Sequence, residues 1–193
     1  MNQRTEKKER SHQAILDSAA ELLRERGIRA SSVGDVMRGA GLTVGGFYGH
    51  FASKEGLFTE VLQRAAQSTW GQLLEAARGA SPRDRVMSVV RRYVSRTHRD
   101  HPESGCLLPA AAGEVAREGE PYRGALADEL GEFVRSLAGL LGDGALARER
   151  AVGVLAAMVG ALTLSRAVAG TPLSDELLRS TRRLIERALA DYE

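Results

Sequence analysis

A chain of 193 residues, of which 43% are hydrophobic, is long enough for one small and one medium-sized domain, each with its own core. Its 27 Lys and Arg residues nearly balance its 25 Asp and Glu residues, and a net charge of +2 is too small for the whole molecule to act as a polyanion binder. A single cysteine, Cys106, excludes an intrachain disulfide and is typical of a reducing compartment.

A basic arm begins the chain, with four cations at Arg4, Lys7, Lys8 and Arg10. One interpretation is a solvated, frayed terminus. The other is an arm that follows the phosphates of a nucleic acid or enters its minor groove, and the pattern of the helices that come next favours it.

Three short helices are predicted after the arm. The apolar residues of the first share one stripe from Ser11 to Arg26, and Gly27 ends it. Ser31-Ser32 offers a cap for the second helix, which ends at Gly41, and Thr43 offers a hydroxyl cap for the third. Because the last two helices are joined by a tight glycine turn, they form a helix-turn-helix.

The third helix carries two pairs of side chains with a spacing of four. Phe47 and Phe51 share one helical face, which predicts a core contact. Val44 and Tyr48 share a neighbouring face, which predicts a contact outside the domain. Each glycine lowers the stability of a helix by roughly 1 kcal/mol relative to alanine. Three of them stand close together here, at Gly45, Gly46 and Gly49, which indicates that the backbone approaches another surface closely.

We expect the outward-facing residues of this region to contact double-stranded DNA. The hydroxyl of Tyr48 is placed to donate to a phosphate. Lys54 follows the Ser53 cap, where helix-terminal amides and an ammonium group suit a phosphate, although it is also a plausible surface lysine. His50 either bonds a phosphate or ties the third helix to the fourth. The predicted contact set is Ser32, Thr43, Val44, Gly45, Gly46, Tyr48, His50 and Lys54.

From about Ser11 to Leu62 the chain resembles the N-terminal domain of the TetR/AcrR family of transcriptional regulators. The resemblance rests on the order Ala-Gly-Leu-Thr, Phe-Tyr-Gly-His-Phe and Ser-Lys-Glu between residues 40 and 55. Members of the family often carry a basic or polar residue where this chain has Val44, which would contact a thymine methyl group instead.

The resemblance implies an all-α fold with two domains. Residues 1–52 would form the arm and the helix-turn-helix domain, and residues 53–193 a helical effector-binding and dimerisation domain, linked through the fourth helix. It also implies a homodimeric repressor that binds a palindromic DNA operator and is released by a small-molecule effector.

Beyond residue 52 the apolar periodicity predicts helices throughout, without strand patterns or internal repeats. The expected ranges are 53–77, 82–99, 104–118, 121–141 and 151–164, with a last helix capped by Ser174.

The last two helices carry apolar residues on two sides, which requires two partners. Either both sides are buried in one subunit, or one side of each helix forms a four-helix contact between two subunits. We favour the dimer, because small residues let another helix approach closely. The predicted interface is Gly153, Ala157, Gly160, Ala161, Leu177, Leu184 and Ile185.

No membrane segment is predicted. The longest uncharged run, Ala151 to Ser165, is shorter than the roughly 20 residues that span a bilayer, and Arg150 and Arg166 flank it. The first residues also lack the apolar stretch of a secretion signal, so we expect a cytoplasmic protein.

Four large side chains of the second domain are candidates for an effector cavity: Trp70, Tyr93, Phe133 and Met158. Each of them either lines a cavity or fills the core.

Cys106 is a fifth candidate. The segment Ser104-Gly105-Cys106-Leu107 resembles the subgroup of repressors of N-ethylmaleimide reductase operons, in which a cysteine responds to electrophiles or oxidants. If a helix starts at Pro102 or Ser104, its dipole would lower the pKa of a thiol in the first turn. The alternative is an inert, small apolar residue.

Two other functions stay open. A Cys106-dependent enzyme would use His98 or His101 as its base, but no third orienting group or nucleotide-binding loop accompanies them. A helical protein-interaction module does not account for Lys54, the basic arm and the bare glycine backbone together. No cofactor or metal site is predicted, because the histidines show no ligand spacing.

Overall fold

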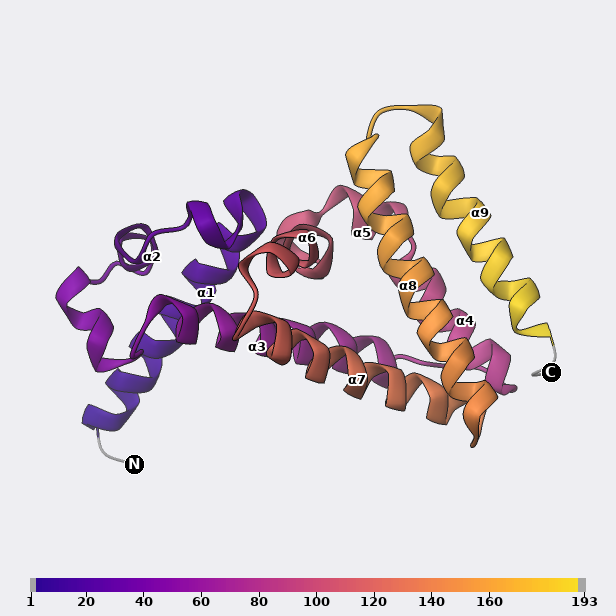
Figure 1. The fold of residues 1–193 in the computed structure, drawn as a ribbon, viewed down its shortest axis with the longest axis horizontal. Coiled ribbons are helices and arrows are strands. Elements are labelled where there is room, and N and C mark those ends of the chain that lie inside the picture. The colour runs from indigo at the N-terminus through magenta and orange to yellow at the C-terminus, as the bar shows by residue number, and fades with distance from the viewer. Residues whose placement is uncertain (1–2, 191–193) are drawn as a thin grey trace. The chain divides into compact units, whose positions relative to one another are not determined.

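The computed structural model describes residues 3–190, which fold into α-helices and two short 3-10 helices (Figure 1). Over these residues there is no β-strand, so the predicted all-α class is confirmed. The chain divides into two compact units that interleave along the sequence. The first contains residues 3–66 and Ala110–Ala127, and the second contains Gln67–Pro109 and residues 128–190.

The first unit holds the predicted helix-turn-helix. Its elements are α1 (Gln3–Ala30), α2 (Val33–Gly39), the 3-10 helix η1 (Val44–Gly49), the first half of α3 (Lys54–Glu75), most of α6 (Leu108–Glu118) and the start of α7 (Tyr122–Leu141). Its core includes Leu57 and Phe58 of α3, which are fully buried. Because α3 packs into the first unit as far as Ala66, the division of the structure falls later than the boundary predicted after residue 52.

Some of the helix ends and caps predicted for the first unit are confirmed and others are wrong. Gly27 interrupts α1 with φ 81° and ψ 177°, and Ser32 caps α2 by accepting a hydrogen bond from the amide of Asp35, as expected. The basic arm is helical from residue 3 onwards and belongs to α1, which corrects the predicted start at Ser11. Thr43 precedes η1 without a side-chain capping bond, so that predicted cap was wrong.

The second unit is built from the remaining helices. They are the second half of α3, α4 (Pro82–Tyr93), α5 (Arg96–Asp100), the 3-10 helix η2 (Pro102–Ser104), most of α7, α8 (Ala145–Ala167) and α9 (Pro172–Ala188). The helices α8 and α9 form a hairpin and pack side by side, and both also contact α4 (Figure 1).

Four expected helices of this part of the chain have different bounds. The helix expected over 151–164 runs from Ala145 to Ala167. The helix predicted over 82–99 is two helices, because Ser95 caps a new one by accepting from the amide of His98. The helix predicted from Ser104 starts at Leu108. The last helix starts at Pro172 after Thr171, while the buried Ser174 donates its hydroxyl to the carbonyl of Ser165 at 2.7 Å instead of capping.

Candidate DNA-binding surface and ligand cavity

The two faces of η1 are disposed as the sequence predicts. Phe47 is fully buried and Phe51 is 6% exposed, with ring centroids 5.8 Å apart. Val44 and Tyr48 are 53% and 74% exposed on the other side. A β-carbon added at Gly45 or Gly49 would meet no atom within 4 Å, so the backbone of η1 is open to a partner.

His50 lies at the edge of this surface. Its Nδ1 atom is buried without a hydrogen-bond partner, and its ring lies 5.8 Å from that of His12 on α1. Burial, and then the neighbouring His12, lowers the pKa of His50, so the imidazole is neutral near pH 7. It is His12 that reaches α3, through a hydrogen bond of 2.9 Å to Glu60. This bond ties α1, and not η1, to α3.

The start of α3 carries the predicted cap and cation. The hydroxyl of Ser53 accepts from the amide of Gly56 at 3.1 Å, which confirms the cap. The ammonium group of Lys54 lies 3.4 Å from the carbonyl oxygen of Arg29 and 5.8 Å from the centroid of the Phe58 ring. Lys54 is only half-buried, so its charge stays available at the helix start.

One contact of the first unit was not foreseen. The carboxylate of Glu114 on α6 accepts hydrogen bonds from the backbone amides of Ile28 at 2.6 Å and Arg29 at 2.8 Å. Both amides follow the break at Gly27, where a β-carbon would lie 2.2 Å from a Glu114 oxygen. Only glycine leaves room for this carboxylate, so α6 is fixed to the end of α1. The partners are 86 and 85 residues apart, and no local pattern links them.

A cavity of about 500 Å³ lies in the second unit. The polar residues of its lining lie on α3, α4 and α5 and at the positions that flank α5, and they are Thr69, Gln72, Arg92, Ser95, Thr97, His98 and His101. Gly105 and Cys106 line it from the segment after η2. Sequence reasoning assigned none of these residues to an effector cavity, because each element contributes only one or two of them.

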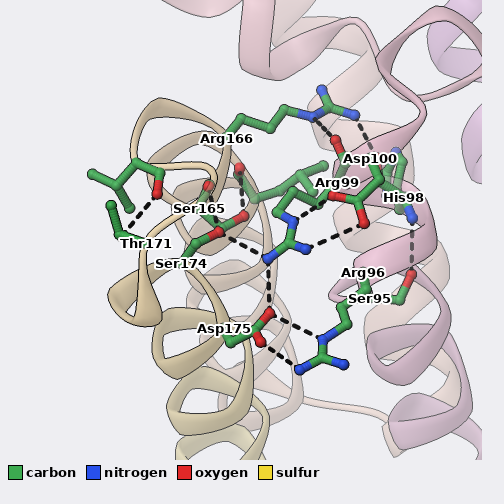
Figure 2. Close-up of polar contacts among 12 residues, drawn as sticks. Ser95, Arg96, His98, Arg99, Asp100, Ser165, Arg166, Thr171, Ser174 and Asp175 are labelled. Carbon is green, nitrogen blue, oxygen red and sulfur yellow. Dashed lines mark hydrogen bonds and ion pairs between the residues drawn. The ribbon is translucent and has the colours of Figure 1, made fainter.

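A network of arginines and carboxylates holds α5 beside α8 and α9 (Figure 2). Asp175 accepts from Arg96 and from Arg99, and these bonds hold the pKa of its carboxyl below the usual value. Arg166 of α8 donates to the carbonyl of His98 at 2.6 Å. The network fixes α5, which carries His98 of the cavity and is followed directly by His101.

Four of the predicted effector residues are core residues. Trp70 stacks on Phe133 with centroids 4.1 Å apart and on Tyr93 at 5.6 Å, and all three are at most 4% exposed. Met158 is fully buried. None of them lines the 500 Å³ cavity, so of the two interpretations the structure supports the core, and a role of these residues in effector binding stays a prediction. Large side chains on the inner faces of four helices meet and fill the space between them.

Cys106 does line the cavity, but not at a helix start. It lies between η2 and α6, two residues before Leu108, and is 3% exposed. The argument from a helix dipole acting on its thiol therefore fails. Its amide donates to Nε2 of His98 at 3.0 Å, while Nδ1 of His98 lies 2.8 Å from the Tyr93 carbonyl.

These two bonds define the state of His98. A carbonyl only accepts, so Nδ1 carries the proton, and an amide only donates, so Nε2 presents its lone pair. Burial lowers the pKa of His98, which keeps this tautomer neutral. Both nitrogens are engaged, so His98 is not placed to act as a base for the thiol of Cys106.

The predicted dimer residues separate into two groups. Gly153, Ala157 and Gly160 on α8, with Leu177 and Leu184 on α9, are half-buried or exposed. Leu164 and Leu173 extend this apolar face and are 55% and 49% exposed. Ala161 and Ile185 are buried inside the second unit and do not belong to the face.

Comparison with known proteins identifies the family. The model of the tetR family of bacterial regulatory proteins matches residues 15–61, and the model of the tetracyclin repressor-like C-terminal domain matches residues 82–180. This chain belongs to the TetR family. The first match covers the helix-turn-helix surface, and the second covers the cavity residues after α3, all of α8 and the first half of α9.

Several relatives share part of the sequence. The helix-turn-helix-type transcriptional repressor KstR2 of Rhodococcus jostii is 31% identical over 120 residues, which are 62% of this chain and 59% of KstR2. The repressor NemR of Escherichia coli is 28% identical over 129 residues, or 65% of this chain and 63% of NemR. The chain thus spans about six tenths of the length of the curated relatives it matches.

Solved structures show the same fold over more of the chain. Reduced NemR of Escherichia coli has a TM-score of 0.78 at 20% identity and covers 92% of this chain and 96% of that structure. A TetR-family regulator from a Rhodococcus species has a TM-score of 0.77 at 21% identity, covering 94% of this chain and all of the other.

The helix α8 also passes a test for membrane helices. It is the one helix in the described part of the chain that is long and apolar enough to cross a bilayer. A core helix of a soluble protein passes the same test, and one side of α8 is buried by α4 and α9. Length and composition therefore do not assign this TetR-family helix to a membrane.

Proposed function

We propose that this chain is a cytoplasmic transcriptional repressor that binds a DNA operator as a homodimer and is released by a small-molecule effector. The observation that carries the proposal is the exposed face of η1, formed by Val44, Tyr48 and open glycine backbone within a TetR-family helix-turn-helix. Two copies of this face in one dimer would enter successive major grooves.

The effector would act through the second unit. Its cavity is of ligand size, and the segment that lines it at Cys106 leads directly into α6. Glu114 then fixes α6 to the amides at the end of α1. A ligand that moves α6 or α3 would change the spacing of the two DNA-binding heads. The electrophile response of Cys106 stays a prediction.

Other functions have less support. The enzyme alternative required His98 or His101 as a base for the Cys106 thiol. Both nitrogens of His98 are engaged elsewhere, and Nδ1 of His101 lies 3.1 Å from a carboxylate oxygen of Glu103. The relatives named above are transcriptional repressors. Among the described residues there is also no group of three His, Cys, Asp or Glu side chains that could hold a metal ion.

Two substitutions test the DNA surface. Lys54→Ala should weaken binding equally on all sequences and lower the salt slope by about one unit, because it removes a phosphate contact. Tyr48→Phe should also weaken binding, through loss of the hydroxyl donor. The measurement is a filter-binding titration over a salt series, with folding of each variant checked by circular dichroism.

Arg148→Ala provides the matched control, because it removes one positive charge from an exposed position on α8, outside the helix-turn-helix. It should leave both affinity and salt slope unchanged. If Lys54→Ala and Tyr48→Phe bind DNA like the wild type, the proposed docking face is wrong.

A further inference from the structure

The lining of the 500 Å³ cavity has an unbalanced charge. It contains the guanidinium group of Arg92, two imidazoles, hydroxyl groups and one amide, and none of its residues is Asp or Glu. The side chain of Arg92 makes no hydrogen bond or ion pair with another described residue. Arg92 is exposed, and its guanidinium group brings to the cavity lining a positive charge that no other described residue pairs with.

The nearby carboxylates are committed to other groups. Glu103 lies 3.1 Å from Nδ1 of His101, and Asp100 accepts from Arg99 at 2.6 Å. Asp175 accepts from Arg96 and Arg99. None of these three acids lines the cavity, so none neutralises Arg92 from within it.

The remaining lining defines the rest of the ligand. Leu73 and Cys106 are buried and supply apolar contact, whereas Thr69, Gln72 and Ser95 supply hydrogen-bond groups. A volume of about 500 Å³ lies within the range of small-molecule sites. A compact apolar body with one negatively charged end matches this combination, because a guanidinium group binds a carboxylate through two parallel hydrogen bonds.

We propose that this cavity binds a small organic carboxylate through Arg92, and that such an acid is the effector class of the repressor. The second part rests on the proposed function, whereas the first does not. Neutral His98 contributes no charge, since its nitrogens serve Tyr93 and Cys106. A bound acid would contact the segment at Cys106 that runs into α6, the helix that carries Glu114.

The test compares acids with amides of the same shape. Isothermal titration calorimetry of the full chain, without DNA, would use benzoate against benzamide and octanoate against octanamide. We expect the Kd of at least one acid to be lower than the Kd of its amide by a factor of about ten or more. A charge-assisted hydrogen bond contributes a difference of this size. Equal affinity within both pairs, or no binding of either acid, would overturn the proposal.

Two variants of adjacent residues locate the charge. Arg92→Gln should abolish the preference for the acid, and Arg92→Lys should restore part of it. Arg91→Gln is the matched control, because Arg91 is exposed on the same helix but faces a separate hollow beside α9. It should keep the wild-type preference. Retention of the preference in Arg92→Gln, or its loss in Arg91→Gln, would contradict the assignment.

The effector role is measured separately. The acid that binds should release the protein from operator DNA in a filter-binding assay, at concentrations near its calorimetric Kd, in the wild type and not in Arg92→Gln. If the acid binds but does not release the protein from DNA, the carboxylate site is supported and its regulatory role is refuted. If the protein binds no DNA, the proposed function is refuted. The calorimetry, which uses no DNA, still tests whether the cavity binds a carboxylate.

Discussion

Gly27→Ala should lower the free energy of unfolding more than any other glycine-to-alanine change in the first unit. At φ 81° and ψ 177° this residue occupies a region that is essentially restricted to glycine, and alanine there costs about 1–3 kcal/mol. The new β-carbon would also lie 2.2 Å from Glu114 and displace a carboxylate that accepts two backbone amides. Hydrogen bonds to charged groups contribute about 1.5–3 kcal/mol each, so the total loss is several kcal/mol. Thermal unfolding should show a Tm lower by roughly 10 °C or more.

Gly119→Ala separates the backbone cost from the collision. Gly119 has a similar φ of 82°, but a β-carbon there would meet no atom within 4 Å. We expect a loss of only about 1–2 kcal/mol. In a double-mutant cycle, Glu114→Ala should cost much less on the Gly27→Ala background than alone, because the bonds are already broken. Equal losses at both glycines, with additive effects of Glu114→Ala, would show that the Glu114 contact contributes little.

Gly160→Leu should dissociate the dimer. Gly153, Ala157 and Gly160 form an outward stripe on α8, and nothing lies within 4 Å of a β-carbon at either glycine within one subunit. If a second subunit packs on this stripe, a leucine side chain forces the helices apart at a cost of typically 1–3 kcal/mol. Two-fold symmetry introduces the change twice, so dimerisation should weaken by about 2–6 kcal/mol.

Sedimentation velocity over a dilution series measures this change. Gly139→Leu is the control, because Gly139 is also an exposed helical glycine with open space, but on α7. It should leave the dimer intact, and the change in helix propensity from glycine to leucine favours the helix. A wild-type chain that sediments as a monomer at micromolar concentration would refute the interface.

Short-range features of the fold were predictable because their causes are local. The spacing of Phe47 and Phe51 fixes one inward face, and that in turn exposes Tyr48. The caps at Ser32 and Ser53 depend on amides only three residues away. The 3-10 geometry of η1 was not predicted, since apolar spacing alone does not separate one tight turn of 3-10 helix from α-helix.

Long-range features were missed because no periodicity encodes them. Glu114 reads as a polar residue on the surface of α6, yet it accepts the amides of residues 28 and 29. Trp70 and Phe133 were candidates for a cavity lining because of their size, and only the fold shows that they fill the core. Arg92 was passed over as one of many arginines, and only the fold brings it to the cavity with Cys106.

The central claim is that two copies of η1 read one operator. Its most direct test is selection of DNA sequences by the wild-type protein from a random duplex pool, followed by hydroxyl-radical footprinting of the selected site. We predict a palindrome whose half-site centres are about 34–36 Å apart, or a multiple of that, with protection on one face of the duplex. Enrichment of no sequence, or a single unpaired half-site protected by a monomer, would contradict the account.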